Sequence, residues 1–140
     1  MLKKTISYTD FNGVERKEDF YFNLSKAEIM EMQYSTVGGL DNMLNKIIAA
    51  QDTKLIMETF KKLILKAYGQ KSDDGKRFIK SEQLAKEFEE TEAYSVLYME
   101  LATNDTAAAA FVNGIIPKDL AEQVSDEMNK GTIAIGTQTN

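Results

Sequence analysis

The side chains that could do acid–base chemistry in this sequence are mainly carboxylates and lysines. Its 140 residues include no histidine and no cysteine. The commonest general base, the cysteine nucleophile and the usual transition-metal ligands are therefore missing. The nearest approach to a catalytic acid–base pair is the group Glu89, Glu90 and Glu92. These residues lie in a run of acids with no sign of the burial that would tune their pKa values, so we interpret them as a solvated face. We expect no enzyme activity, no catalytic residue and no cofactor.

Two short segments could be mistaken for ligand-binding loops. The stretch 72–75 (SDDG) is rich in oxygen ligands, but a calcium loop needs them at alternating positions, with a glutamate at the twelfth. The pair Gly38-Gly39 lacks the glycine and lysine spacing of a nucleotide-binding loop. We therefore predict a plain turn at 72–75 and a helix break at Gly38-Gly39, with no metal site.

Charge is unevenly distributed along the chain. Basic residues concentrate in 61–80 and acidic residues in 81–102, while the formal net charge is −5. The basic segment could be a nucleic-acid patch, but no aromatic residues interleave with its lysines in the manner of single-strand binders. We favour mutual compensation of the two segments within one fold, and we expect no nucleic-acid partner. No run approaches the ~20 apolar residues of a membrane helix, so we expect no membrane partner either.

The remaining candidates for function are apolar. Residues 20–34 are rich in aromatic residues and methionine, and most of them should enter the core. Tyr21, Met30 and Met32 cannot all point the same way as the neighbouring core residues, so some soft apolar surface should remain exposed. The predicted partner-binding residues are Tyr21, Met30, Met32 and Tyr34.

Residues 2–24 are predicted to form a β-hairpin. Apolar and polar residues alternate over residues 2–9, and the pair Asn12-Gly13 suits a tight hairpin turn. In the second half Phe20, Phe22 and Leu24 share one face at the period of two that a half-buried strand requires.

Helical patterns follow the hairpin. Ser25 and Glu28 form a capping-box pattern at the start of a first helix that should end near Gly38-Gly39. A second helix is expected over residues 40–50, and Asp52 is a candidate N-cap for a third. The third helix has the clearest apolar face, which consists of Leu55, Ile56, Phe60, Leu63, Ile64, Ala67 and Tyr68.

The second half of the chain is predicted to be helical after a polar connection at 69–80. Ser81, Thr91 and Asn104 or Asp105 should cap three further helices, and a last polar helix should cover 118–129. The predicted fold class is mainly α, with about six or seven short helices in a compact bundle and an N-terminal β-hairpin, so α+β only at the margin. We expect one domain at 1–130, with the hairpin at 2–24 and the helical body at 25–129, followed by a flexible tail at 131–140.

A series of short segments also resembles a known family. The segments are 20–29 (FYFNLSKAEI), 38–40 (GGL), 60–69 (FKKLILKAYG), 71–80 (KSDDGKRFIK), 91–95 (TEAYS), 99–103 (MELAT) and 111–117 (FVNGIIP). In this order they resemble tail assembly chaperones of long-tailed, non-contractile bacteriophages of the siphovirus type. The specificity comes from the series, which covers residues 20–117, and not from any one motif.

The resemblance implies a non-enzymatic helper in tail morphogenesis. Such proteins bind the tape measure protein, keep it soluble, help recruit tail tube subunits and leave before the tail is complete. The implied partners are therefore the tape measure protein, the tail tube protein and a longer frameshifted form of the chain, and an oligomer is compatible with this role. The implied location is the host cytoplasm and not the mature virion. The alternative is a small structural virion protein of the tail or the head–tail connection.

Overall fold

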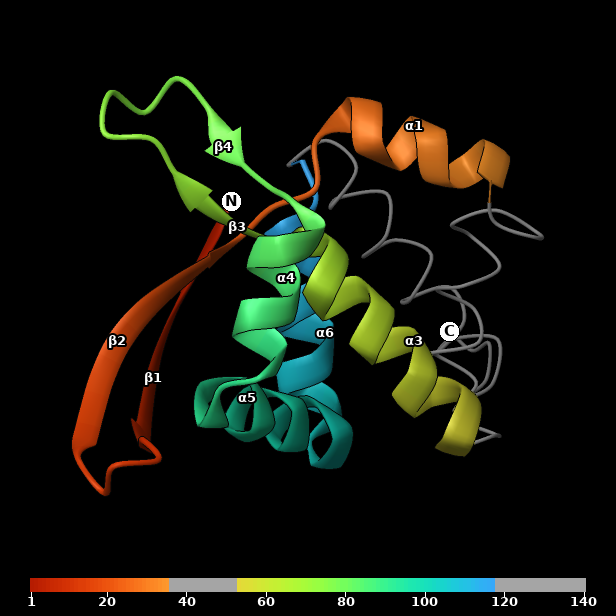
Figure 1. The fold of residues 1–140 in the computed structure, drawn as a ribbon. Coiled ribbons are helices and arrows are strands. Elements are labelled where there is room, and N and C mark those ends of the chain that lie inside the picture. Colours follow the sequence, from red (N-terminus) through yellow and green to blue (C-terminus); the bar gives the residue numbers. More distant parts are fainter. Residues whose placement is uncertain (36–52, 118–140) are drawn as a thin grey trace.

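A computed structural model of the protein describes residues 1–35 and 53–117 (Figure 1). Its strands are β1 (Leu2–Thr9), β2 (Glu15–Phe22), β3 (Tyr68–Lys71) and β4 (Phe78–Ile79). Its helices are α1 (Lys26–Ser35), α3 (Thr53–Ala67), α4 (Glu82–Glu89), α5 (Glu92–Thr103) and α6 (Asp105–Ile115). Among these residues, no helix is long and apolar enough to cross a bilayer.

The predicted N-terminal hairpin is confirmed. Strands β1 and β2 pair along their whole length in an antiparallel register that sets Leu2 opposite Phe22 and Thr9 opposite Glu15. Alternate residues of β1 face inward, and Ile6 is the most deeply buried of them. The turn between the strands is closed by a hydrogen bond of 2.9 Å from the Asp10 amide to the Val14 carbonyl. Local pattern and turn chemistry were therefore sufficient to define this element.

The Asn12-Gly13 turn yields a first testable prediction. Gly13 has a φ angle of +79°, and an added Cβ there would meet no atom within 4 Å. Changing Gly13→Ala should therefore cost only the backbone strain of the left-handed conformation, about 1 kcal/mol of unfolding free energy. Urea denaturation followed by circular dichroism measures this loss. Gly13→Asn is the matched control, because asparagine tolerates positive φ, and an equal loss for both variants would contradict the argument.

The predicted bundle of six or seven helices is wrong. The described residues form five helices and one four-stranded antiparallel sheet in the order β1-β2-β3-β4, so the fold is an α+β mixture. The error lies at 69–80, where a polar connection was expected and a second hairpin, β3 and β4, is found. Tyr21 lies opposite Gly69 and Phe22 opposite Tyr68, so β3 extends the sheet from β2. These strands are short, and the pairing of β3 with β2 is a long-range contact that local propensity does not reveal.

Glycine is required at the start of the second hairpin because the backbone there is crowded. A Cβ on Gly69 would lie 2.6 Å from Cε2 of Phe78 and 2.8 Å from the carbonyl oxygen of Ile79. The turn predicted at 72–75 is confirmed between β3 and β4. Its hydrogen bonds include 2.9 Å from the Gly75 amide to the Ser72 carbonyl and 2.7 Å from the Ser72 hydroxyl to the Asp74 carboxylate.

The helices cover one side of the sheet and bury its inward face (Figure 1). Phe22 is fully buried, and its ring lies 5.4 to 5.8 Å from the rings of Tyr68, Phe88 and Phe111. This aromatic cluster joins β2 and β3 to α4 and α6. It therefore connects the two hairpins with the helical layer.

The predicted capping residues are confirmed at four helices. The Ser25 hydroxyl accepts from the Glu28 amide at 3.1 Å, and the Glu28 carboxylate accepts from the Ser25 amide at 2.9 Å. Ser81, Thr91 and Asn104 each accept a hydrogen bond from a first-turn amide of α4, α5 and α6 respectively. Side-chain caps of this type satisfy helix-end amides that would otherwise lack partners.

Several predictions lie outside the described residues. They are the break at Gly38-Gly39, the helix at 40–50, the Asp52 cap, the helix at 118–129 and the tail at 131–140. The division into one domain at 1–130 and a tail stays a prediction.

Candidate protein-interaction surfaces

The acidic residues that most resembled a catalytic group lie at the junction of α4 and α5. Glu89 is 3.0 Å from the Lys61 ammonium of α3, Glu90 is the C-cap of α4, and Glu92 is in the first turn of α5. Burial and the charge of Glu89 raise the pKa of Tyr94 to about 12, so this phenol stays protonated at neutral pH. Among the described residues, no group of acids is arranged to hold a metal ion.

Outside that junction, the ammonium of Lys80 connects several elements of the fold. It donates to the Glu28 carboxylate at 2.7 Å and to the carbonyl oxygens of Asn23 and Lys66 at 2.6 and 2.9 Å. These contacts join the segment after β4 to the first turn of α1 and the last turn of α3. Burial opposes ionisation of Glu28, but hydrogen bonds from Lys80 and Ser25 outweigh it and hold the pKa of Glu28 below its ordinary value. This pair is therefore a structural link between these elements.

The tip of the first hairpin presents two large apolar side chains to solvent. Phe11 is 76% exposed and Val14 is 51% exposed. The loop that carries them is held by the Asp10 carboxylate, which accepts from the amides of Asn12 and Val14 at 2.9 Å each. The Arg16 guanidinium donates to the same carboxylate at 2.6 Å and is the main reason that the pKa of Asp10 lies below its usual value. A loop that is held by these hydrogen bonds and carries exposed apolar side chains is suited to contact another protein.

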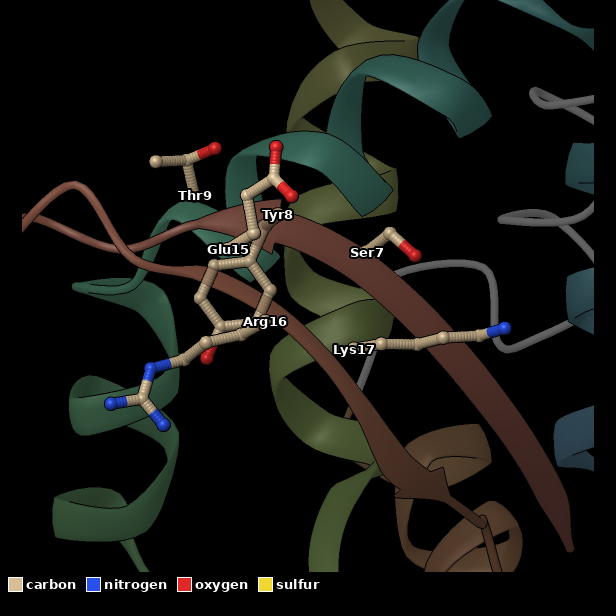
Figure 2. A pocket seen from close by; sticks show the side chains of 6 residues that line it. All are labelled: Ser7, Tyr8, Thr9, Glu15, Arg16 and Lys17. Atoms are coloured by element: carbon tan, nitrogen blue, oxygen red, sulfur yellow. The ribbon is translucent and has the colours of Figure 1, made fainter.

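A shallow hollow of about 430 Å³ lies next to this tip, between residues 7–9 of β1 and 15–17 of β2 (Figure 2). Figure 2 shows the side chains of Thr9 and Glu15 on one side of the hairpin and those of Tyr8 and Arg16 on the other. Their arrangement forms an uneven two-sided surface and not an enclosed cavity. The surface is suited to a polypeptide partner more than to a small molecule.

A second hollow, of about 420 Å³, lies where β2 and β3 diverge. Its lining includes Phe20, Tyr21, Gly69 and Lys71. The Lys71 ammonium lies 5.3 Å from the centre of the Tyr21 ring, within the range of a cation–π contact. Tyr21 therefore has a partner on β3, although its side chain is only partly buried.

Comparison with known protein families decides the identity of the chain. A family model described as phage tail assembly chaperone matches residues 1–139, which is nearly the whole sequence. The chain belongs to this family. No curated protein and no solved structure shows a significant match. The family resemblance found in residues 20–117 is thereby confirmed, and tails of the long non-contractile type are compatible with it.

Membership in the tail assembly chaperone family implies protein partners in tail assembly and points to a non-enzymatic role. Besides Phe11 and Val14, the large apolar side chains exposed among the described residues are Met1, Met30, Met57, Val96 and Met99.

The structure separates three of the four predicted partner-binding residues of this chaperone. Met30 is 63% exposed on α1. Met32 follows Ile29 by three residues, and both are buried in the core. Tyr21 lies on β2 beneath Lys71, and the side chain of Tyr34 is outside the part that the structure describes. The role of the four residues in binding stays a prediction.

The hairpin tip of the chaperone was not among the predicted sites. Phe11 directly precedes the Asn12-Gly13 turn, and an apolar residue next to a tight turn is a signal for exposure that the sequence contains. The exposure of Val96 and Met99 has no comparable signal, because α5 is apolar on several sides and only packing shows which side is covered.

Proposed function

We propose that this tail assembly chaperone binds the tape measure protein, keeps it soluble and helps recruit tail tube subunits during tail morphogenesis. The observation that supports the proposal is the family match over residues 1–139. A tape measure protein is a long helical chain, and its amphipathic segments would aggregate without a partner. The chaperone acts in the host cytoplasm, alongside a longer frameshifted form of itself, and is released before the virion is complete.

Met30 is the best candidate contact for such a helical segment. Its side chain is exposed on α1, and the thioether adapts to apolar surfaces of varied shape. Helix-in-groove recognition uses a few apolar anchors of this type, spaced along one face of the bound helix. The exposed Phe11 at the hairpin tip supplies a second apolar contact away from α1.

Co-expression with the tape measure protein tests the proposal. The soluble fraction of the tape measure protein should rise several-fold with the chaperone, and the two should be recovered as a complex. Met30→Gln should reduce both effects, because a polar amide replaces an apolar anchor. Glu31→Gln, an exposed change on the next residue of α1, is the matched control and should behave as the wild type. Equal insolubility with and without the chaperone would refute the proposed function.

Mass spectrometry of purified virions tests the proposed release. The chaperone should be absent from complete particles and present in lysates of infected cells. A structural protein of the tail or head–tail connection would instead be found in many copies per particle. Detection of this chain in many copies in purified virions would therefore contradict its proposed release.

A further inference from the structure

Strand β1 forms one edge of the sheet, and in the part of the chain that the structure describes no strand pairs with its outer side. The Asp10 amide donates to the Val14 carbonyl, so residue 10 points its backbone groups toward the second strand. In an antiparallel ladder this orientation alternates from residue to residue. The amide and carbonyl groups of Lys3, Thr5, Ser7 and Thr9 therefore point away from β2. An edge of this length is a template for another strand.

An apolar strip of helix α5 flanks this edge. Helix α5 packs on β1, and the Lys4 ammonium lies 2.9 Å from the Glu100 carboxylate. Val96 precedes Glu100 by one helical turn. Met99 is at the i+3 position from Val96, so the two side chains are neighbours on the surface of α5. Their side chains are 43% and 55% exposed. The strand edge and the strip formed by Val96 and Met99 thus lie on neighbouring elements. One partner could contact both.

Symmetry decides which edge of the sheet could accept a second copy of the chain. Two copies of one strand pair antiparallel about a two-fold axis perpendicular to the sheet, and side chains opposite each other then share a face. The axis must therefore lie at one residue position, so that this residue is opposite the same residue of the second copy. On β2, β3 leaves residues 15–20 unpaired, and an axis at Phe20 would require Tyr21, which β3 already pairs. The axis would therefore pass through one of the charged residues Glu15, Arg16, Lys17, Glu18 and Asp19. Every such register on β2 sets two like charges against each other, which is unfavourable.

Strand β1 does not have this obstacle. Its central residues Thr5, Ile6 and Ser7 are uncharged, so the two-fold axis can pass through any of them without repulsion. With the axis at Ile6, Thr5 lies opposite Ser7 of the second copy and Lys3 lies opposite its Thr9. All four outward-pointing residues then pair, with about eight backbone hydrogen bonds between the copies. No like charges face each other in this register.

We propose that the chain forms a two-fold symmetric dimer through β1, with the register centred on Ile6 and with Val96 and Met99 of α5 covered at the same interface. The dimer joins the two sheets into one continuous sheet. It does not depend on the proposed binding of the tape measure protein, because it uses neither Met30 nor Phe11.

The test is the molar mass of the full chain in solution, measured by sedimentation equilibrium over a wide concentration range. The wild type should reach twice the monomer mass. Ser7→Pro removes one outward-pointing amide without removing a hydrogen bond to β2, so it should weaken the dimer at least about tenfold. Ser7→Ala keeps the amide and should dimerise as the wild type does. Circular dichroism verifies that each variant is folded.

Val96→Lys with Met99→Lys provides a test that does not alter the strand. Both positions are exposed, so the monomer should remain folded while the dimer is lost. Amide hydrogen exchange should also slow at Thr5 and Ser7 as the concentration rises. A wild type that stays monomeric at all concentrations would overturn the proposal. A dimer unaffected by these charges, or without protection at Thr5 and Ser7, would also overturn it.

Discussion

Replacing Phe22 by alanine should lower the unfolding free energy by about 3–5 kcal/mol, the usual range for a fully buried phenylalanine. The ring has no exposed surface and contacts the rings of Tyr68, Phe88 and Phe111. Its removal would leave a cavity where both hairpins meet the helices. The loss is large relative to the 5–15 kcal/mol that stabilises a typical domain, so the variant should be partly unfolded at 37 °C.

Phe11→Ala is the matched control, since it makes the same chemical change at a side chain that is 76% exposed. It should alter the unfolding free energy by no more than about 0.5 kcal/mol. Urea denaturation monitored by tyrosine fluorescence and by circular dichroism measures both variants. Similar losses for the two would show that Phe22 is not at the centre of the core.

The sequence predicted those parts of the fold that depend on residues close together in the chain. The first hairpin follows from alternation and the Asn12-Gly13 turn, and the helix starts follow from Ser25, Ser81, Thr91 and Asn104. Each is a local hydrogen-bond pattern with a definite residue preference. Such patterns identify elements but do not say which elements pair.

Strand β3 could not be predicted in this way because its partner is distant in the sequence. Tyr68 ends the apolar face of α3 by spacing, yet it pairs with Phe22, and its ring stacks on Phe88 at 4.4 Å. The helical pattern therefore ran past the true end of α3 at Ala67. Residues Gln70 and Lys71 are exposed surface residues, and only their pairing with Ile79 and Phe78 of β4 makes them part of a strand.

The candidate partner-binding surface was predictable in part. Met32 was predicted as a partner-binding residue but is buried, because it lies three residues from Ile29 and shares its helical face. Met30 was grouped with Met32 and Tyr21 as a source of exposed apolar surface, and its side chain is exposed. What the sequence did not reveal is the position of these faces relative to the hairpin, which depends on packing. Lys80 links the first turn of α1 to Asn23, which follows β2, and to the last turn of α3. Its position in a basic segment of the sequence did not indicate these contacts.

Replacing Lys80 by methionine should cost about 2 kcal/mol of unfolding free energy. The change leaves the Glu28 carboxylate without its cation and removes the donor to the carbonyls of Asn23 and Lys66. Breaking a fully buried pair costs about 3–5 kcal/mol, but both side chains here keep about a quarter of their surface exposed, so the expected loss is smaller. Burial also lowers the pKa of Lys80, and the attraction of Glu28 offsets this effect only in part. Methionine avoids that burial cost, which reduces the loss further.

The dependence on pH identifies the contribution of Glu28. Its pKa in the folded protein lies below the ordinary value of 4.5, so its stabilising effect is complete above pH 4.5 and is lost as the pH falls through the folded value. Glu28→Gln should therefore be less stable than the wild type at neutral pH, and the difference should shrink as the pH falls below 4.5 and through the folded pKa of Glu28. A difference that stays constant with pH would contradict an ionic contribution of Glu28, because both the Lys80 pair and the bond from the Ser25 amide favour its ionised form. The Lys80 pair would then contribute little to the position of α1, the helix that presents Met30.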